Sequence, residues 1–376
     1  MADDTDKRLF TPGPLTTSPT VKAAMLRDLG SRDDEFLTVV AGIRASLLRL
    51  AGVSVALGFE AVPVQGSGTY GVEATITTAV SADDGSLLVG SNGAYGDRLV
   101  RIAETAGIRV EAVRTSEDQR VEAAALERAL ERTPSLTHVA VVHCETSSGI
   151  VNDVDAIGAM CRRTGRCFIV DSMSGFGALP VDLEAAGIDF LVSSANKCMQ
   201  GVPGFSFVLA RRAVLAGCAG RSPSLSLDLH AQWRGLEDSG QFRFTPPTHA
   251  MLAFAQALRE LDAEGGPEGR GRRYAANQRR LVAGMRALGL ETVLPDALHG
   301  PVITTFRFPS DERFAFETFY RCLSERGFVI YPGKLSKLDC FRIGTAGHLF
   351  EADIDALLAA IADVLAEMGL ESMGPS

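Results

Sequence analysis

The chain has 376 residues and a formal net charge of −9 at pH 7, with 46% hydrophobic and 22% charged residues. These values are typical of a globular chain of about two domains, and they exclude an intrinsically disordered protein. The negative charge argues against nucleic-acid binding, which needs a basic footprint. It does not exclude small anionic ligands, because a local cluster of positive groups can override the global sign.

The seven cysteines form no CxxC pair, and the six histidines show no metal-ligand spacing. Neither a disulfide framework nor a metal site is therefore expected. Residues Met1–Phe10 are polar and acidic, unlike a signal peptide, and no apolar run approaches the ~20 residues that span a bilayer. We expect a reduced, cytoplasmic protein without membrane contact.

Short apolar runs alternate with helix-like stretches over most of the chain. In chain order, the expected elements are a helix at Val72–Val80, a strand at Ser86–Val89, a helix at Val121–Arg132, a strand at His138–His143, a helix at Ala156–Thr164, and strands at Cys167–Asp171 and Phe190–Ser193. This alternation predicts an α/β fold with a mostly parallel sheet covered by helices on both faces. The strands read as continuous apolar runs, which is typical of buried parallel strands.

A smaller α/β unit is expected after a break at Asp262–Gly271, which is rich in glycine and glutamate and carries Pro267. The expected elements around and after this break are helices at Thr248–Leu261, Arg272–Leu288, Phe316–Arg326 and Asp353–Met368, and strands at Pro301–Phe308 and Cys340–Ile343. We therefore divide the chain into an N-terminal segment at 1–20, a large domain at 21–262 and a small C-terminal domain at 263–376.

Lys197 is the strongest candidate for chemistry among only five lysines. It follows an apolar run and a small polar turn in IDFLVSSANKCMQGVPG, the sequence of Ile188–Gly204. Most loop lysines are surface residues, but apolar and small neighbours would desolvate this amine and lower its pKa. A lysine with a lowered pKa is what Schiff-base chemistry requires.

Asp171 ends a buried strand and precedes a loop rich in serine and glycine. Ligands of open parallel sheets bind at such strand ends, although a lone acid there is equally a helix cap or a loop anchor. Paired with Lys197, it gains a specific role. A carboxylate that keeps a pyridine nitrogen protonated turns the ring into an electron sink.

Two further loops offer groups for an anion and a flat ring. In QGSGTYGVE, Gln65–Glu73, free amides at a helix start and the hydroxyls of Ser67 and Thr69 would form a phosphate cup. In SNGAYG, Ser91–Gly96, Tyr95 would stack on a ring. Each loop is weak evidence alone, because glycine-rich turns and half-buried turn aromatics are common.

Polar groups also follow or interrupt two other apolar strands. In HCETSSG, His143–Gly149, we favour capping and loop hydrogen bonds for Glu145 and a satisfied loop role for His143. Arg342 lies within the apolar strand CFRIG and must pair with an anion when buried. It is either a fork for the acid group of a substrate or a bridge to a structural carboxylate.

With these residues in place, the chain resembles the fold-type I, class V aminotransferases, and among them the 2-aminoethylphosphonate–pyruvate aminotransferases. The resemblance runs from about Phe10 to Ala362. The motifs that carry it are LFTPGPLTTS, SNGAYG, HCETSSGI, DSMSGFG, SANKC with GVPG, SLSLDL, RFTPPTHAMLAFAQAL, NQRRLVAGMRALG, GFVIYPGK and DCFRIG. Their number and order make the resemblance specific, unlike any single motif.

The resemblance implies pyridoxal 5′-phosphate as the cofactor. Lys197 would hold it as a Schiff base and move the substrate proton, and Asp171 would pair with the pyridinium nitrogen. Arg342 would hold the acid group of the substrate, with the Pro12–Gly13 loop closing over it. The implied cofactor-binding residues are Ser67, Gly68, Thr69, Tyr95, Thr146, Asp171, Ser194, Lys197 and Thr245.

The implied reaction is a reversible ping-pong transamination between a small amino donor and a 2-oxo acid: 2-aminoethylphosphonate and pyruvate give phosphonoacetaldehyde and L-alanine. Thr245 would reach the cofactor phosphate of a partner subunit, so a homodimer with shared active sites is expected. The alternatives are an alanine– or serine–glyoxylate aminotransferase, a transaminase for a substituted aminophosphonate, and a non-catalytic pyridoxal-binding regulator. A cysteine desulfurase fits less well, because no cysteine lies in a polar loop suited to persulfide chemistry.

The sequence departs from the family pattern near the substrate entrance. Gln200 replaces a glutamate, Gly175 stands where a second serine is usual, and Thr345 stands where asparagine is frequent. None of these departures touches Lys197 or Asp171. They bear on the identity of the amino donor, not on the class of reaction.

Overall fold

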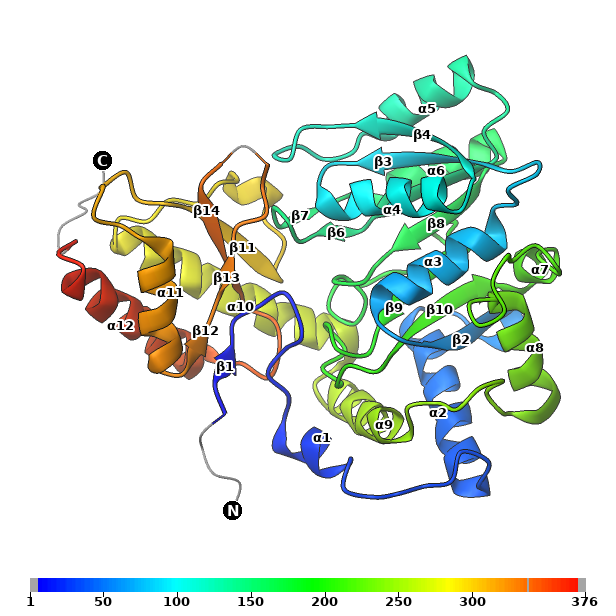
Figure 1. The fold of residues 1–376 in the computed structure, drawn as a ribbon, viewed down its shortest axis with the longest axis horizontal. Coiled ribbons are helices and arrows are strands. Elements are labelled where there is room, and N and C mark those ends of the chain that lie inside the picture. Colours follow the sequence, from blue (N-terminus) through cyan, green and yellow to red (C-terminus); the bar gives the residue numbers. More distant parts are fainter. Residues whose placement is uncertain (1–5, 337, 371–376) are drawn as a thin grey trace.

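The computed structural model describes residues 6–336 and 338–370. Its larger part is built on a seven-stranded sheet with the order β2-β10-β9-β8-β5-β3-β4 (Figure 1). These strands are β2 (Phe59–Gln65), β3 (Ser86–Ser91), β4 (Arg109–Arg114), β5 (His138–Val142), β8 (Cys167–Asp171), β9 (Phe190–Ser194) and β10 (Phe205–Arg211). Only β10 runs antiparallel to its neighbours, so the expected mostly parallel sheet is confirmed.

Helices cover both faces of this sheet. They are α2 (Asp34–Leu50), α3 (Gly68–Ala79), α4 (Ala94–Thr105), α5 (Ala123–Arg132), α6 (Val154–Thr164), α7 (Arg212–Ala216), α8 (Leu229–Ser239) and α9 (Thr248–Ala263). In Figure 1, α3 and α4 lie in front of the sheet and α6 lies behind it. The strands β3, β5, β8 and β9 are buried along almost their whole length, as the continuous apolar runs predict, whereas the edge strand β4 is partly exposed.

The rest of the chain packs around a second apolar core with its own antiparallel sheet in the order β11-β14-β13. Its elements are α10 (Gly266–Ala287), β11 (Ile303–Arg307), α11 (Phe316–Glu325), β12 (Phe328–Val329), β13 (Tyr331–Pro332), β14 (Cys340–Gly344) and α12 (Glu351–Glu367). The N-terminal segment joins this part, because β1 (Arg8–Leu9) pairs with β12 and Phe10 is fully buried in the second core. After α1 (Pro19–Ala23), the chain enters the larger part.

Two expectations about element boundaries were wrong for identifiable reasons. The helix expected from Val72 starts at Gly68, because Ser67 occupies the N-cap position and the glycine lies inside the first turn. The expected break at Asp262–Gly271 is mostly helix. Only Glu264 and Gly265 separate α9 from α10, and Pro267 sits in the first turn of α10, where proline is tolerated. The division into domains at 262 stays a prediction.

Within the described part of the chain, no helix is both long and apolar enough to cross a membrane. All seven cysteines are free. Two short strands, β6 (Cys144–Glu145) and β7 (Ile150–Val151), form a small hairpin beside the carboxyl end of β5. This hairpin and the strand ends of the larger sheet position the site described next.

Candidate active site

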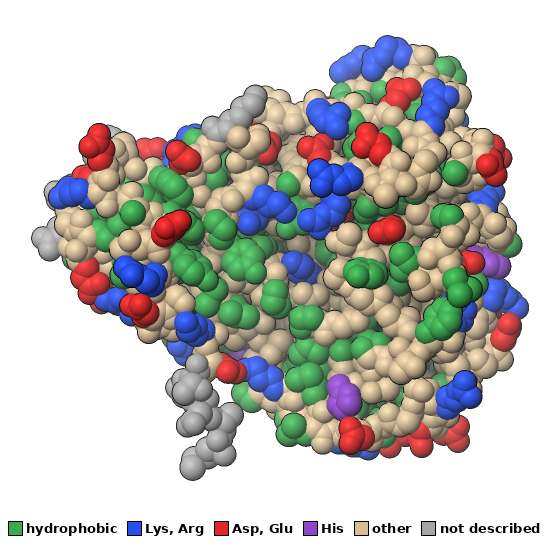
Figure 2. Space-filling view, viewed as in Figure 1, with side chains coloured by type: hydrophobic (Ala, Val, Ile, Leu, Met, Phe, Trp, Pro, Cys, Tyr) green, Lys and Arg blue, Asp and Glu red, His purple; other side chains and the backbone are tan. Residues whose placement is uncertain are grey.

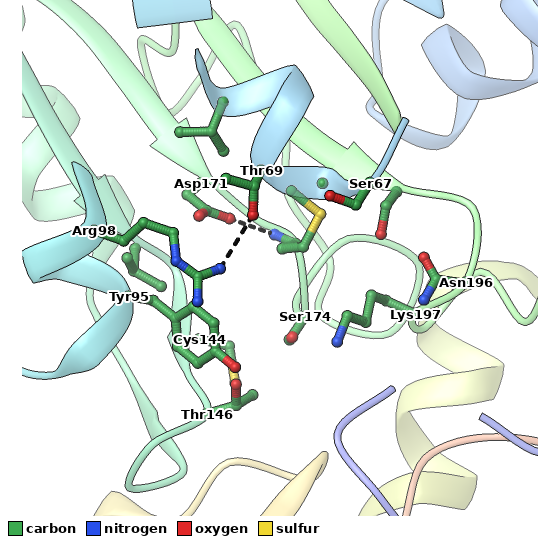
Figure 3. A pocket seen from close by; sticks show the side chains of 15 residues that line it. Ser67, Thr69, Tyr95, Arg98, Cys144, Thr146, Asp171, Ser174, Asn196 and Lys197 are labelled. Carbon is green, nitrogen blue, oxygen red and sulfur yellow. Dashed lines mark hydrogen bonds between the residues drawn. The ribbon is translucent and has the colours of Figure 1, made fainter. Parts of the chain in front are cut away.

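A cavity of about 220 Å³ lies where β5, β8 and β9 end and α3 begins. It occupies the crevice at the carboxyl ends of parallel strands, the usual ligand position in such sheets. Eight residues expected at the site line it together: Ser67, Gly68, Thr69, Tyr95, Thr146, Asp171, Ser194 and Lys197. Loops far apart in sequence thus converge, and Figure 3 shows their side chains directed toward a common space.

Lys197 follows β9, and its amine is directed into the cavity (Figure 3). Its Nζ donates a hydrogen bond of 2.8 Å to the carbonyl oxygen of Pro12. Burial lowers the pKa of Lys197 below its ordinary value, although the charges of Tyr95 and Asp171 oppose this shift. A larger share of neutral amine therefore forms near neutral pH, and the neutral amine is the nucleophile.

Asp171 is the last residue of β8 and is only 8% exposed. Burial raises the pKa of its carboxyl group to about 6, and the charge of Glu145 adds to the rise. One carboxylate oxygen accepts a hydrogen bond of 2.9 Å from the Met173 amide, and this hydrogen bond lowers the pKa. Among the described residues, the Met173 amide is the one hydrogen-bond donor to this carboxyl group, so a cationic group placed against it would be strongly stabilised.

The N-terminus of α3 forms an anion cup. Ser67 occupies the N-cap position of this helix, but its side chain makes no capping hydrogen bond. The hydroxyl of Ser194 is buried and lacks a partner among the described residues. A Cβ atom at Gly68 would lie 2.3 Å from the Met173 sulfur, so only glycine fits there without a shift. Free helix amides and an unpaired buried hydroxyl are suited to a phosphate group.

Glu145 holds Tyr95 in place from the β6–β7 hairpin. Its buried carboxylate accepts hydrogen bonds from the amides of Tyr95 (3.2 Å) and Gly96 (3.1 Å) in the first turn of α4. It also accepts hydrogen bonds from the amide (3.2 Å) and hydroxyl (2.5 Å) of Ser147. The capping interpretation of Glu145 is confirmed, and it ties the aromatic residue to the loop that carries Thr146.

His143 also has the structural role favoured from the sequence. It is buried, and its Nδ1 lies 2.9 Å from the Ser172 hydroxyl.

The departures from the family pattern at Gly175 and Gln200 are explained by the packing around these residues. A Cβ atom at Gly175 would lie 2.7 Å from Nδ1 of His143, and Gln200 donates hydrogen bonds to the Tyr274 hydroxyl and to the backbone.

Arg342 lies in the middle of β14, beside the cavity rather than in its lining. Its Nε donates to the carbonyl of Pro332 (3.0 Å) and its Nη1 to the carbonyl of Thr146 (2.9 Å). No carboxylate among residues 6–336 and 338–370 forms an ion pair with it. Within that part of the chain two backbone carbonyls, not a carboxylate, hold the guanidinium, and the role of Arg342 toward a substrate stays a prediction.

The loop at Pro12–Gly13 lies directly against Lys197. A Cβ atom at Gly13 would lie 2.5 Å from the lysine Cδ, and the φ of Gly13 is +124°. Gly13→Ala should displace the amine and lower turnover on the order of 10²-fold, since small misplacements near the reacting atoms have effects of this size. Steady-state kinetics and a thermal melt measure the two effects separately.

Gly165→Ala is the matched control for that variant. Gly165 also has a positive φ of +65°, but an added Cβ atom would meet nothing within 4 Å. The control should lower the free energy of unfolding by about 1 kcal/mol and leave turnover unchanged. Equal turnover of Gly13→Ala and Gly165→Ala would contradict the proposed contact with Lys197.

Thr245 lies outside the cavity of its own chain. It is exposed, and its carbonyl accepts a hydrogen bond of 3.0 Å from the Gln65 side chain, just before the anion cup. The role of Thr245 stays a prediction.

Sequence reasoning missed two cations beside the cavity. Arg98 lines it, donates to the Thr69 hydroxyl (3.1 Å), and places its guanidinium carbon 4.8 Å from the centroid of the Tyr95 ring. Figure 3 shows this guanidinium beside the ring. Lys334 lies 4.0 Å from the same centroid. Arg98 could have been predicted, because residues three apart on a helix are neighbours and Tyr95 lies three residues before it. Lys334 could not, because it lies far from Tyr95 in the sequence.

Comparisons with known proteins agree with this geometry. The family model "Aminotransferase class-V" matches residues 76–337. The 2-aminoethylphosphonate–pyruvate transaminase of Klebsiella pneumoniae subsp. pneumoniae is 54% identical over 355 residues, which cover 94% of this chain and 96% of the relative. The chain belongs to the class-V aminotransferase family. A relative of the same description from Salmonella paratyphi B matches this class-V aminotransferase with the same identity and coverage.

Solved structures give the same fold. The alanine–glyoxylate aminotransferase of Nostoc sp. has a TM-score of 0.88 and 26% identity to this class-V aminotransferase, covering 96% of this chain and 95% of that one. The pyridoxamine–pyruvate aminotransferase of Mesorhizobium loti has a TM-score of 0.87 and 24% identity, and the match covers 98% of this chain and 94% of that one. The fold-type I architecture expected from the sequence is confirmed.

The cofactor of this family is pyridoxal phosphate, and the cavity fits it. The unpaired Ser194 hydroxyl and the free amides of α3 suit its phosphate group. The buried carboxyl group of Asp171 suits a protonated ring nitrogen, and Lys197 suits its aldehyde. No group of three or more metal-ligating side chains occurs among the described residues.

Proposed function

We propose that this class-V aminotransferase transfers the amino group of 2-aminoethylphosphonate to pyruvate, reversibly and by a ping-pong mechanism, giving phosphonoacetaldehyde and L-alanine. The observation that carries the proposal is 54% identity over nearly the full length to relatives of that activity. The cations beside the cavity support it, because the amino donor carries an acidic group.

The roles proposed for the chain's own residues follow from their positions. Bound pyridoxal phosphate supplies an electron sink for the charge that develops on the amine-bearing carbon of the substrate. Lys197 Nζ would hold the cofactor through its aldehyde and would be released when a substrate amine takes its place. The freed amine would then take the proton from the amine-bearing carbon of the substrate and hold it for the next proton transfer. When this amine is free, the carbonyl of Pro12 accepts a hydrogen bond from it and holds it in place.

Other residues orient the cofactor and the substrate. Asp171 would keep the ring nitrogen protonated, and Tyr95 would stack on the ring from a position fixed by Glu145. Arg342 binds the acid group of the amino donor and of the 2-oxo acid in turn. The proposed phosphate contacts are Ser67, Gly68, Thr69 and Ser194.

We also propose a cytoplasmic homodimer with shared active sites. Three large apolar side chains near the anion cup and Thr245 are exposed in one subunit: Tyr70 (53%), Leu225 (79%) and Phe244 (43%). A second copy would bury them and bring Thr245 to the partner's phosphate site. Sedimentation analysis of the wild type and of Thr245→Ala tests this, with a monomeric active wild type as the contradicting result.

A panel of amino donors with pyruvate tests the reaction. Formation of alanine from 2-aminoethylphosphonate and pyruvate, together with conversion of the cofactor from the pyridoxal to the pyridoxamine form, would support the proposal. Faster turnover with serine or alanine and glyoxylate would support the glyoxylate-dependent alternative instead. Faster turnover of a 1-hydroxy aminophosphonate would support the substituted-donor alternative.

A further inference from the structure

Lys334 approaches the active site from the opposite part of the chain. It lies between β13 and β14, and its half-buried side chain crosses to the larger part of the molecule. There its Nζ lies 4.0 Å from the centroid of the Tyr95 ring. Figure 2 shows Lys and Arg side chains gathered around the hollow between the two parts, with a further one inside it.

Positive charge exceeds negative charge at this corner of the site. Burial alone would raise the pKa of Tyr95, but the charges of Lys334 and Lys197 outweigh it and lower the pKa. Arg342 also interacts with Tyr95. Of the buried carboxylates nearby, Glu145 is already occupied by amide donors.

Lys334 contacts the Tyr95 ring, and among the residues that the structure describes no carboxylate forms an ion pair with its ammonium group. Its nearby chain is anchored elsewhere, because Glu117 accepts hydrogen bonds from the amide and hydroxyl of Ser336. The loop is therefore held against the larger part of the chain while the lysine amine stays available to an anion.

We propose that Lys334 is a second cation for the acid group of the amino donor, acting with Arg342, and that it selects a dianionic phosphonate over a carboxylate. This inference rests on the proposed function and names the residue that sets its substrate class. Arg342 is held by two backbone carbonyls, so its charge is fixed in place. Lysine is a point charge on a flexible stem, so it can move from the Tyr95 ring to the ligand.

Charge explains the selectivity. A phosphonate group carries two negative charges once its second proton is lost, whereas a carboxylate carries a single charge. The attraction of one added cation grows in proportion to the ligand charge. A site with one arginine would serve both acid groups, and a second cation favours the group with the larger charge.

Ethylphosphonate and propionate test how the acid group alone affects binding. Neither compound has an amine, so neither can react. Titration calorimetry on the holoenzyme should show a dissociation constant for ethylphosphonate that is about 10- to 100-fold higher in Lys334→Met, the range expected for one lost charged hydrogen bond. The constant for propionate should change much less. Lys334→Arg should retain most of the affinity, and Lys22→Met, at an exposed lysine paired with Asp6, is the matched control.

Kinetics provide the second readout. In Lys334→Met, the KM for 2-aminoethylphosphonate should rise while kcat at saturation stays close to the wild type, because the cation binds the ground state and the transition state alike. Unchanged ethylphosphonate affinity in Lys334→Met, or an equal loss for propionate, would overturn the inference. A wild type that does not use 2-aminoethylphosphonate would instead overturn the proposed function, whatever Lys334 does.

Discussion

Lys197→Ala should abolish the visible absorbance that pyridoxal phosphate acquires on bonding to a lysine amine, and should reduce turnover by at least about 10²–10⁴-fold. The lower bound is the usual contribution of a positioned proton-transfer group, and the variant also loses the covalent link. The effect is specific because Lys197 is the only lysine that lines the cavity within the described residues. An absorbance spectrum and a single-turnover assay measure both losses.

The fold should survive this change, since the lysine amine makes a single hydrogen bond to the Pro12 carbonyl. Lys22→Ala, at an exposed lysine, should leave both spectrum and turnover as in the wild type. An unchanged spectrum in Lys197→Ala would refute the assignment of the cofactor-bonding residue. Loss of circular dichroism in Lys197→Ala would show that the lysine supports the fold instead.

Asp171→Asn should reduce turnover on the order of 10²–10³-fold while retaining the cavity. A neutral amide cannot keep the pyridine nitrogen protonated, so the ring loses its capacity to accept electrons. The magnitude is that of removing one preorganised electrostatic partner from a buried site. The variant should still form the bond to Lys197, so its spectrum separates this defect from loss of the lysine.

The same substitution should stabilise the protein without cofactor at high pH. Because burial raises the folded-state pKa of Asp171 from 3.8 to about 6, its contribution to stability is fully present below pH 3.8 and is lost as the pH rises through 6. Asp171→Asn removes this loss, so its free energy of unfolding at pH 8 should exceed that of the wild type by up to about 3 kcal/mol. Near pH 3.8 and below, the difference should vanish.

Chemical denaturation of the two apoproteins across this pH range tests the sign. A wild type that is more stable than Asp171→Asn at pH 8 would show that the carboxylate is well paired in the folded protein. The expected result would instead identify Asp171 as a residue that lowers stability and is kept for its interaction with a bound cation.

The alternation of strands and helices, and the residues at the strand ends, could be predicted from the sequence alone. The apolar runs at Cys167–Asp171 and Phe190–Ser194 are long enough to identify buried strands, and Asp171 is the last residue of its strand. Periodicity succeeds here because burial on both faces leaves a continuous apolar signal. It failed at Gly68 and Gly266, where glycine indicated a loop although each residue begins a helix.

The contacts between distant loops could not be predicted from the sequence. The contact of Lys197 with Pro12, the capping of Tyr95 by Glu145, and the approach of Lys334 join segments far apart in the sequence. Local sequence encodes local backbone preference, whereas these contacts depend on how two separate cores pack against one shared N-terminal segment. The reactive residues could therefore be identified from the sequence, whereas the charges that surround them depend on the packing of the two parts of the chain.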